Sequence, residues 1–131
     1  DLVKARPEAR DSSWQGYEGN NLEIVLDLGR KQDLYELELS CFENNNARIF
    51  LPARVVVEVS VDGRKFELVS EKEFALPGKA QTAGARSIYI PLKGAEARFV
   101  RVKAINVGTV PEGFRNAGQK AWMLFDEIYV R

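Results

Sequence analysis

Valine recurs at every second position of one segment, and this period constrains the fold more than any other feature of the sequence. The segment holds Val55, Val57, Val59 and Val61, followed by the dipeptide Asp62-Gly63. A helix would need apolar residues three and four apart, so the period of two predicts a strand. The Asp-Gly dipeptide supplies the positive φ angles of a tight β-hairpin, and we expect its second arm at residues 66–74.

Other segments show the same alternation or are bounded by turn residues. Strands are expected at residues 22–28, 34–41, 88–92, 100–104 and 128–130. Seven or eight short strands separated by turn signals are typical of an all-β fold, an antiparallel β-sandwich or jelly roll. The connection at residues 106–121 is longer than most in a compact domain, which predicts either a functional loop or one that packs over the core.

Composition limits the size and the partners of the domain. The chain has 131 residues, 45% hydrophobic and 29% charged, so we expect residues 1–131 to form one domain with one core. Its 19 Lys and Arg residues balance 19 Asp and Glu residues, which argues against nucleic acid as a partner because such binding neutralises phosphates. No segment approaches the roughly 20 apolar residues that span a membrane.

The residue types favour binding over catalysis. The sequence has no histidine, the commonest general base and metal ligand. Its single cysteine, Cys41, cannot form an internal disulfide, and it follows Leu37 and Leu39 at strand spacing, so we expect it in the core. Asp126 and Glu127 are adjacent, and alternation along a strand would place them on opposite faces, where they could not flank one glycosidic bond.

Several short motifs, taken in order, resemble one known family. They are Trp14-Gln15-Gly16, Leu26-Asp27-Leu28-Gly29, Leu51-Pro52, Val59-Ser60-Val61-Asp62-Gly63 with Phe66, Phe99-Val100-Arg101-Val102 and Phe125-Asp126-Glu127-Ile128. The series resembles the discoidin-like family, also called the coagulation factor five/eight C-type domain, and in particular its family 32 carbohydrate-binding branch. The resemblance runs from about Asp11 onward. It implies a jelly-roll sandwich of the galactose-binding-domain type, without catalytic activity.

A narrower resemblance suggests a parent protein. The residues 14–19, Asn106-Val107-Gly108 and 122–127 are similar to those of the C-terminal accessory domain of bacterial family 20 glycoside hydrolases, the β-N-acetylhexosaminidases. This resemblance implies a secreted parent enzyme, periplasmic or extracellular, whose catalytic domain is a partner of the chain. The chain begins at Asp1 without a signal peptide, so we expect it to be part of a longer polypeptide.

The resemblance also implies a structural calcium ion that ties the first loop to the last strand. The matching residues are Asp11, Ser13 and Glu127. Calcium takes six to eight oxygen ligands, so these three side chains form only part of a shell. The chain also lacks the paired cysteines of the eukaryotic branch and a complete opening Asp-Gly motif. The alternative is that Asp11 caps a turn and that Glu127 is solvated or ion-paired.

The family binds sugars through loops at one end of the sandwich, where an aromatic ring stacks on the sugar and planar polar groups bind its hydroxyls. The candidate ligand-binding residues are Arg48, Asn44, Asn45, Phe50, Phe114, Arg115 and Trp122. The implied ligand is a glycan of the galactose or N-acetylhexosamine type. The alternatives are that the asparagines only form a turn, that Phe50 belongs to the core, and that the domain packs on the catalytic domain without binding sugar.

Overall fold

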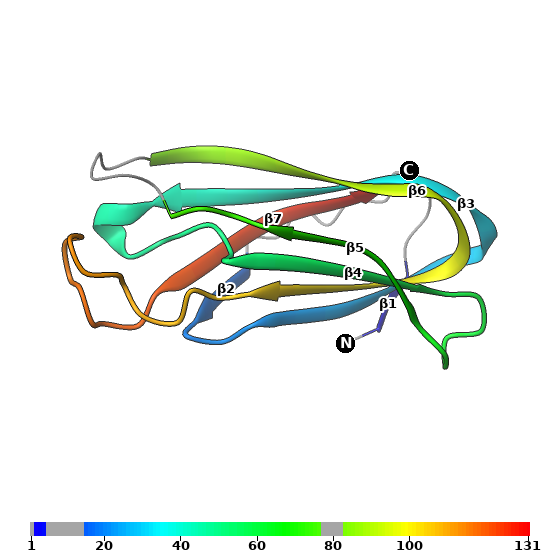
Figure 1. Ribbon diagram of the computed structural model, residues 1–131, viewed down its shortest axis with the longest axis horizontal. Coiled ribbons are helices and arrows are strands. Elements are labelled where there is room, and N and C mark those ends of the chain that lie inside the picture. Colours follow the sequence, from blue (N-terminus) through cyan, green and yellow to red (C-terminus); the bar gives the residue numbers. More distant parts are fainter. Residues whose placement is uncertain (1, 5–14, 77–82) are drawn as a thin grey trace.

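The computed structural model describes residues 2–4, 15–76 and 83–131 (Figure 1). The elements in chain order are β1 (Leu2–Lys4), β2 (Gln15–Glu18), β3 (Leu22–Asn44), the 3-10 helix η1 (Asn45–Ala47), β4 (Arg54–Ser60), β5 (Glu67–Glu73), β6 (Ala83–Ile105) and β7 (Trp122–Val130). Apart from η1, the regular structure of these ranges is β, which confirms the predicted all-β class. In the described part of the chain, no helix has the length and hydropathy to cross a membrane.

The strands form a mainly antiparallel sheet that curls into two layers. The strand order is β2-β7-β3-β6-β4-β5, and β1 pairs with β3 in parallel. Residues 36–44 of β3 pair with residues 83–91 of β6 in the layer that holds β7. Residues 22–27 of β3 pair with residues 99–104 of β6 in the layer that holds β4. The two long strands therefore belong to both layers and bend at the right-hand end of Figure 1, which confirms the jelly-roll sandwich.

The bend of β3 corrects the prediction that a strand ends at Gly29. The strand continues to Asn44, with a register shift between Asp27 and Gln32. Gly29 has a φ angle of +85°, which side chains disfavour. Asp27 Oδ1 accepts hydrogen bonds from the Gly29 amide at 2.9 Å and from Arg98 Nε at 2.8 Å. These bonds fix the bend around a carboxylate that is only 5% exposed.

The valine strand lies where the sequence predicts it, but its turn is longer than predicted. Val55 and Val57 are fully buried in β4. Val61 is 54% exposed, so the alternation stops before it. The connection to β5 runs from Val61 to Phe66, so it is longer than a two-residue hairpin turn. Among these six residues, only Gly63 has a positive φ angle.

The Asp62 side chain holds this longer turn in shape. Its Oδ1 atom accepts hydrogen bonds from the backbone amides of Arg64 at 2.8 Å and Lys65 at 3.0 Å, and from the Ser60 hydroxyl at 3.0 Å. These donors stabilise the charged carboxylate and lower the pKa of Asp62 to about 2. A local turn motif thus replaces the hairpin that the Asp-Gly dipeptide predicts.

The core lies between the two layers and confirms most of the predicted inner rows. Its members from the long strands include Leu26, Leu37, Leu39, Ile88, Ile90, Leu92, Val100 and Val102. Cys41 is 1% exposed, as expected for a core residue. Burial raises the pKa of the Cys41 thiol to about 12, and the Glu43 carboxylate adds to the shift. The thiol is therefore protonated and unreactive at neutral pH.

Candidate functional site

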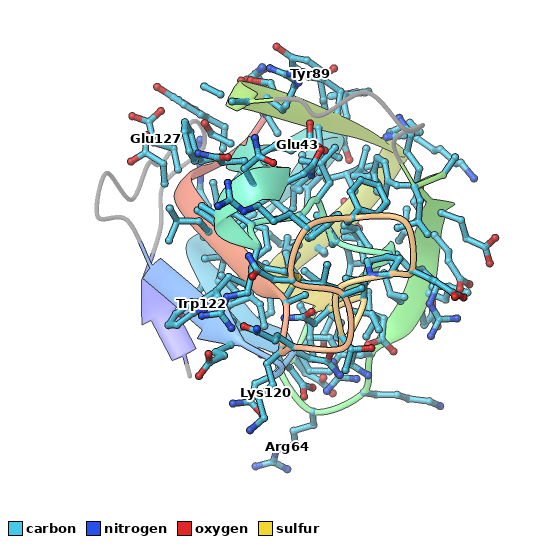
Figure 2. All side chains as sticks on the ribbon, turned by 90° about the vertical axis from the view of Figure 1, so that its left-hand side faces the viewer. Glu43, Arg64, Tyr89, Lys120, Trp122 and Glu127 are labelled. Carbon is cyan, nitrogen blue, oxygen red and sulfur yellow. The ribbon has the colours of Figure 1, made fainter. Side chains whose placement is uncertain are left out.

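Three connections meet at one end of the sandwich, which we call the loop end. They are the turn between β2 and β3 (19–21), the segment around η1 (44–50) and the long loop of residues 106–121. They lie at the left of Figure 1, and Figure 2 views this end directly. The sequence prediction that the candidate sugar-binding loops share one end therefore agrees with the architecture.

The segment around η1 is folded by its own asparagines. Asn44 caps η1, since its Oδ1 accepts a hydrogen bond from the Ala47 amide at 3.3 Å. The Asn45 side chain is buried, and its Nδ2 donates to the Ile49 carbonyl at 3.4 Å. Both observations support the turn-forming alternative for these residues. Asn46 is exposed at the tip of the segment.

Arg48 joins the segment around η1 to the long loop, to the end of β2 and to the start of β7. Its backbone is left-handed, with a φ angle of +66°, and its carbonyl accepts a hydrogen bond from the Trp122 amide at 2.7 Å. Its Nη1 atom donates to the Lys120 carbonyl at 3.1 Å and lies 3.6 Å from Glu18 Oε2. The sequence offered no structural explanation for Arg48, and these contacts supply one. Its side chain remains 29% exposed, so the guanidinium is also accessible to a ligand.

The two phenylalanines of the candidate site pack on each other. Their ring centroids are 5.2 Å apart in an edge-to-face arrangement. Phe50 is 2% exposed and forms a small second core with Val110 and Ala121, against which the half-buried Phe114 rests. Phe50 therefore offers no ring face to a ligand and takes the core role that the sequence left open. Phe114 anchors the long loop to this core.

Trp122 and Arg115 are, with Arg48, the candidates that remain accessible. Trp122 is half-buried at the start of β7 and lies against Gly16 of β2, where a methyl group would come within 2.9 Å of the indole Cζ3. Arg115 is exposed on the long loop, next to Asn116 in left-handed backbone. The structure thus brings Arg48 and Trp122 together through backbone hydrogen bonds, and it places Arg115 on the loop above the Phe114 anchor.

Asn106 organises the loop end, although the sequence analysis did not identify it as a site residue. Its buried Nδ2 donates to the carbonyls of Tyr17 at 3.0 Å, Asn20 at 3.2 Å and Ala121 at 3.2 Å. Its Oδ1 accepts from the Gly108 amide at 2.8 Å. Asn106 therefore ties the long loop to the turn before β3. The Tyr17 and Asn20 carbonyls come from a distant part of the chain, so no local pattern reveals these two bonds.

A buried acidic residue at the same end was also missed. Glu43 is 4% exposed at the end of β3 and lies 3.6 Å from Arg86 Nε across the strand pair. The end view in Figure 2 labels Glu43. The signal was available in the sequence, because Glu43 follows Leu39 and Cys41 in the inner row of period two. A carboxylate in such a row needs a specific partner, which Arg86 provides.

The predicted calcium ligands are only partly within the structure. Asp11 and Ser13 lie outside the described residues. Glu127 is half-buried in β7 and projects at the rim of the end view, apart from Trp122 and Lys120 (Figure 2). Among the described residues, no group of three acidic, cysteine or histidine side chains is placed to hold a metal ion. Glu127 alone supplies only a small part of the six to eight oxygen ligands that calcium requires.

The Asp126-Glu127 pair corrects one step of the sequence argument. Leu39 pairs with Ile128 and Cys41 with Phe125, so Ser40 faces two residues of β7 in a β-bulge. Strict alternation does not hold in a bulge, and the opposite-face argument against a catalytic pair fails there. The neighbouring carboxylates still stand side by side on one strand, and do not face each other across a cleft.

Comparison with known proteins places the chain in a family. A search of curated protein sequences finds no significant match. Among solved structures, CpGH89CBM32-6 from Clostridium perfringens is 18% identical, with a TM-score of 0.54 over 88% of this chain and 75% of that one. The C-terminal domain of a chitobiase from Bacteroides fragilis is 21% identical, with a TM-score of 0.47 over 86% of this chain and 63% of that one.

A third structure, CpGH89CBM32-5 from Clostridium perfringens in complex with GalNAc-β-1,3-galactose, is 18% identical, with a TM-score of 0.47 over 87% of this chain and 76% of that one. The first of these structures supports the fold described above. The family described as the F5/8 type C domain matches residues 4–128. That match covers nearly the whole sequence, and the chain belongs to the F5/8 type C domain family.

Proposed function

We propose that the chain is a non-catalytic carbohydrate-binding module that keeps a parent glycoside hydrolase close to its glycan. Membership of the F5/8 type C family supports this proposal, as does the likeness of fold to a family 32 carbohydrate-binding module. The observation that carries it is the loop end, where Arg48 and Trp122, from distant segments, are joined by a backbone hydrogen bond and both keep partly exposed side chains.

In this proposal Arg48 and Arg115 donate hydrogen bonds to sugar hydroxyls, and the ring of Trp122 stacks on the apolar face of a pyranose. The exposed edge of one half-buried ring buries little area, so the proposed affinity is weak, in the range of micromolar to millimolar. Phe50, Phe114 and Asn45 act behind this surface as the support that holds the loops in place.

The experiment is an NMR titration of the chain with galactose, N-acetylgalactosamine and N-acetylglucosamine. The complex recorded for CpGH89CBM32-5 guides the choice of the first two sugars. We expect saturable shifts of the amide signals of Arg48, Arg115 and Trp122. Arg115→Ala is the informative variant, because Arg115 makes no contact in the core and its loss should weaken binding without unfolding the chain.

Lys72→Ala is the matched control, since Lys72 is an exposed cation on β5 that contacts only the ring of Phe74 among the described residues. It should leave the titration unchanged. Absence of any shift at tens of millimolar of all three sugars would remove the sugar-binding proposal.

The proposed parent is a secreted family 20 hydrolase of the β-N-acetylhexosaminidase type, located in the periplasm or outside the cell. The narrower sequence resemblance supports this parent. Sequencing the complete gene tests it, because the proposal requires an adjoining family 20 catalytic domain and an export signal. A gene that encodes neither would contradict this part of the proposal and leave the module itself unaffected.

The second candidate function is a structural one, in which the domain packs on the catalytic domain and binds no sugar. The observation in its favour is the exposure of large apolar side chains, among them Tyr35, Leu68 and Tyr89. Such residues are often covered by a partner. This function would be favoured if the chain binds the separate catalytic domain and loses that binding in Leu68→Ser or Tyr89→Ser. It also requires that the sugar titrations produce no chemical-shift changes.

The structural calcium ion is a further part of the proposal. Its expected ligands are Asp11, Ser13 and Glu127, completed by backbone carbonyls. Bound calcium stabilises the native state by mass action, so a chelator should lower the melting temperature, and excess calcium should restore it. Glu127→Gln should remove the response. A melting temperature that is indifferent to chelator would contradict the calcium site.

A further inference from the structure

A shallow hollow opens at the opposite end of the sandwich, beside the connection between β4 and β5. We call it the turn hollow. It is lined by Val25, Asp62, Gly63, Arg64, Phe66, Phe99 and Arg101. The connection lies at the lower right of Figure 1, far from the loop end. The proposed function does not use this hollow.

A guanidinium group lies over each of the two aromatic rings that line the turn hollow, one from the lining residue Arg101 and one from the neighbouring Arg98. The Arg101 guanidinium carbon lies 4.1 Å from the centroid of the Phe66 ring, and that of Arg98 lies 4.9 Å from the Phe99 ring. Gly63 packs so closely on Phe99 that a methyl group there would come within 3.1 Å of the ring. The floor of the hollow is therefore apolar and is fixed in position by its neighbours.

The polar groups at its rim keep unused hydrogen-bonding capacity. Arg101 donates from Nε to Glu58 Oε1 at 2.9 Å, and its terminal nitrogens bond to no described residue. The Arg64 side chain, labelled in Figure 2, pairs with none of the described side chains. Guanidinium groups of this kind bind a carboxylate through two parallel hydrogen bonds.

Charged side chains of both signs surround the turn hollow. Four cations lie in or beside it, namely Arg64, Lys65, Arg101 and Lys103. The nearby carboxylates are Asp62, Glu67, Glu96, Glu58 and Glu23. Glu96 pairs with Lys31, Glu58 pairs with Arg101 and Lys103, and Glu23 acts on Arg101. The neighbouring Arg98 is already neutralised by its two bonds to Asp27. Asp62 Oδ1 is occupied by three donors. Among these groups, Arg64 and Lys65 are the cations without a described side-chain partner, against the single carboxylate Glu67, so a small positive excess remains at the rim.

We propose that the turn hollow is a second saccharide site, which takes a sugar residue that carries a carboxylate. The apolar floor of Phe66 and Phe99 receives the C–H face of the pyranose, and Arg64 and Arg101 bind the carboxylate from the rim. The proposal rests on the proposed function in taking a saccharide as the ligand class. It adds a charged ligand and a location at the other end of the molecule.

The test is an NMR titration of the complete 131-residue chain with galacturonic acid, galactose and acetate. We expect galacturonic acid to shift the amide signals of Gly63, Arg64 and Phe66, with galactose roughly tenfold weaker and acetate without saturable effect. The tenfold factor is what one charged hydrogen-bonded contact contributes. Equal responses to galactose and galacturonic acid, or a saturable response to acetate, would overturn the proposal.

Variants separate the ligand contacts from the fold. Arg64→Ala should weaken galacturonic acid binding roughly tenfold. The affinity of Arg64→Lys should lie between those of the unsubstituted chain and Arg64→Ala, because lysine keeps the positive charge but cannot form the two parallel hydrogen bonds of a guanidinium group. Arg30→Ala, which removes an exposed arginine from the bend of β3 outside the hollow, should change nothing. An unchanged affinity in Arg64→Ala contradicts the assignment.

The same spectra distinguish this inference from the proposed function, because the signals of the two ends are separate. Shifts at Arg48 and Trp122 without shifts at Gly63 and Arg64 would overturn the turn hollow alone. Shifts at Gly63 and Arg64 without shifts at the loop end would support the turn hollow and remove the loop end from the proposed function.

Discussion

Single side chains with several hydrogen bonds hold the loop end in place, and Asn106 is the clearest of them. Its side-chain amide contacts three backbone carbonyls and one backbone amide, and of these only the Ala121 carbonyl has a further backbone donor, the Gly19 amide, among the bonds described for loops and turns. Removing such a group leaves the partners unsatisfied, and each costs about 1–3 kcal/mol when solvent cannot reach it. Asn106 is therefore a residue on which the geometry of the candidate site depends.

We predict that Asn106→Ala lowers the free energy of unfolding by about 2–4 kcal/mol, because the Tyr17 and Asn20 carbonyls and the Gly108 amide lose a side-chain partner at once. Urea denaturation of the variant and of the unsubstituted chain measures the difference. Asn46→Ala, at an exposed position of the same end, is the control and should stay within about 0.5 kcal/mol. Similar values for the two variants would show that the network does not stabilise the fold.

Asp62 predicts a dependence of stability on acid pH. The folded pKa of about 2 lies below the ordinary value of 3.8, because amide and hydroxyl donors stabilise the carboxylate. The contribution is present above the unfolded pKa and is lost as the pH falls from about 4 through 2. The melting temperature of Asp62→Asn should approach that of the unsubstituted chain as the pH falls through this interval. A constant difference between the two proteins from pH 6 to pH 2 would contradict the prediction.

At the scale of the element, period-two patterns located the strands well and their ends poorly. The inner rows of β4 and of the second half of β6 are buried as predicted, since alternation follows directly from strand geometry. Gly29 was interpreted as the end of a strand, but there it allows β3 to bend and continue. Positive-φ glycines serve both purposes, so the residue type alone does not distinguish a bend from a stop.

The glycines at the turn and at the bend give a matched pair of substitutions. Gly63 and Gly29 have φ angles of +81° and +85°, but only Gly63 packs against a ring, at 3.1 Å from Phe99. Gly29→Ala should cost about 1–2 kcal/mol from backbone strain alone. Gly63→Ala should cost more, because the methyl group also displaces the Phe99 ring. Thermal unfolding measures the loss of stability in both variants. Equal losses would show that the Phe99 ring moves aside from the added methyl group at no cost in stability.

The candidate site shows the same limit of sequence analysis. Turn residues and loop length marked the segments 44–50 and 106–121, because these signals are local. The contact of Arg48 with Lys120 joins residues 72 positions apart. Such pairs depend on how the layers are stacked, and the sequence pattern contains no information about that. For this reason the burial of Phe50 and the role of Asn106 emerged only from the structure.

At the scale of the whole molecule, β3 and β6 join the two layers into one cooperative unit. Each long strand pairs within both layers, so neither layer can form its complete set of hydrogen bonds while the other is unfolded. The molecule should therefore unfold in a single transition. Most strand pairs join distant segments of the chain, which is typical of slowly folding β-sandwiches.

We predict that Leu39→Ala and Val102→Ala lower stability without splitting the transition, although the two residues lie in different layers. The expected losses are about 2–4 kcal/mol, from lost burial and the cavity that remains. Tryptophan fluorescence and circular dichroism should give the same urea midpoint for each variant. Different midpoints from the two probes would show that the layers unfold separately.

The continuous course of β3 and β6 has a mechanical consequence. Each runs from one pole of the domain to the other and back without a flexible joint, held by ladders on both sides (Figure 1). In the proposed function, tension between a bound glycan and an attached enzyme would thus be carried by two continuous, hydrogen-bonded strands. The domain behaves as a stiff spacer, and the reach of any attached enzyme is set by its linker, not by motion inside the sandwich.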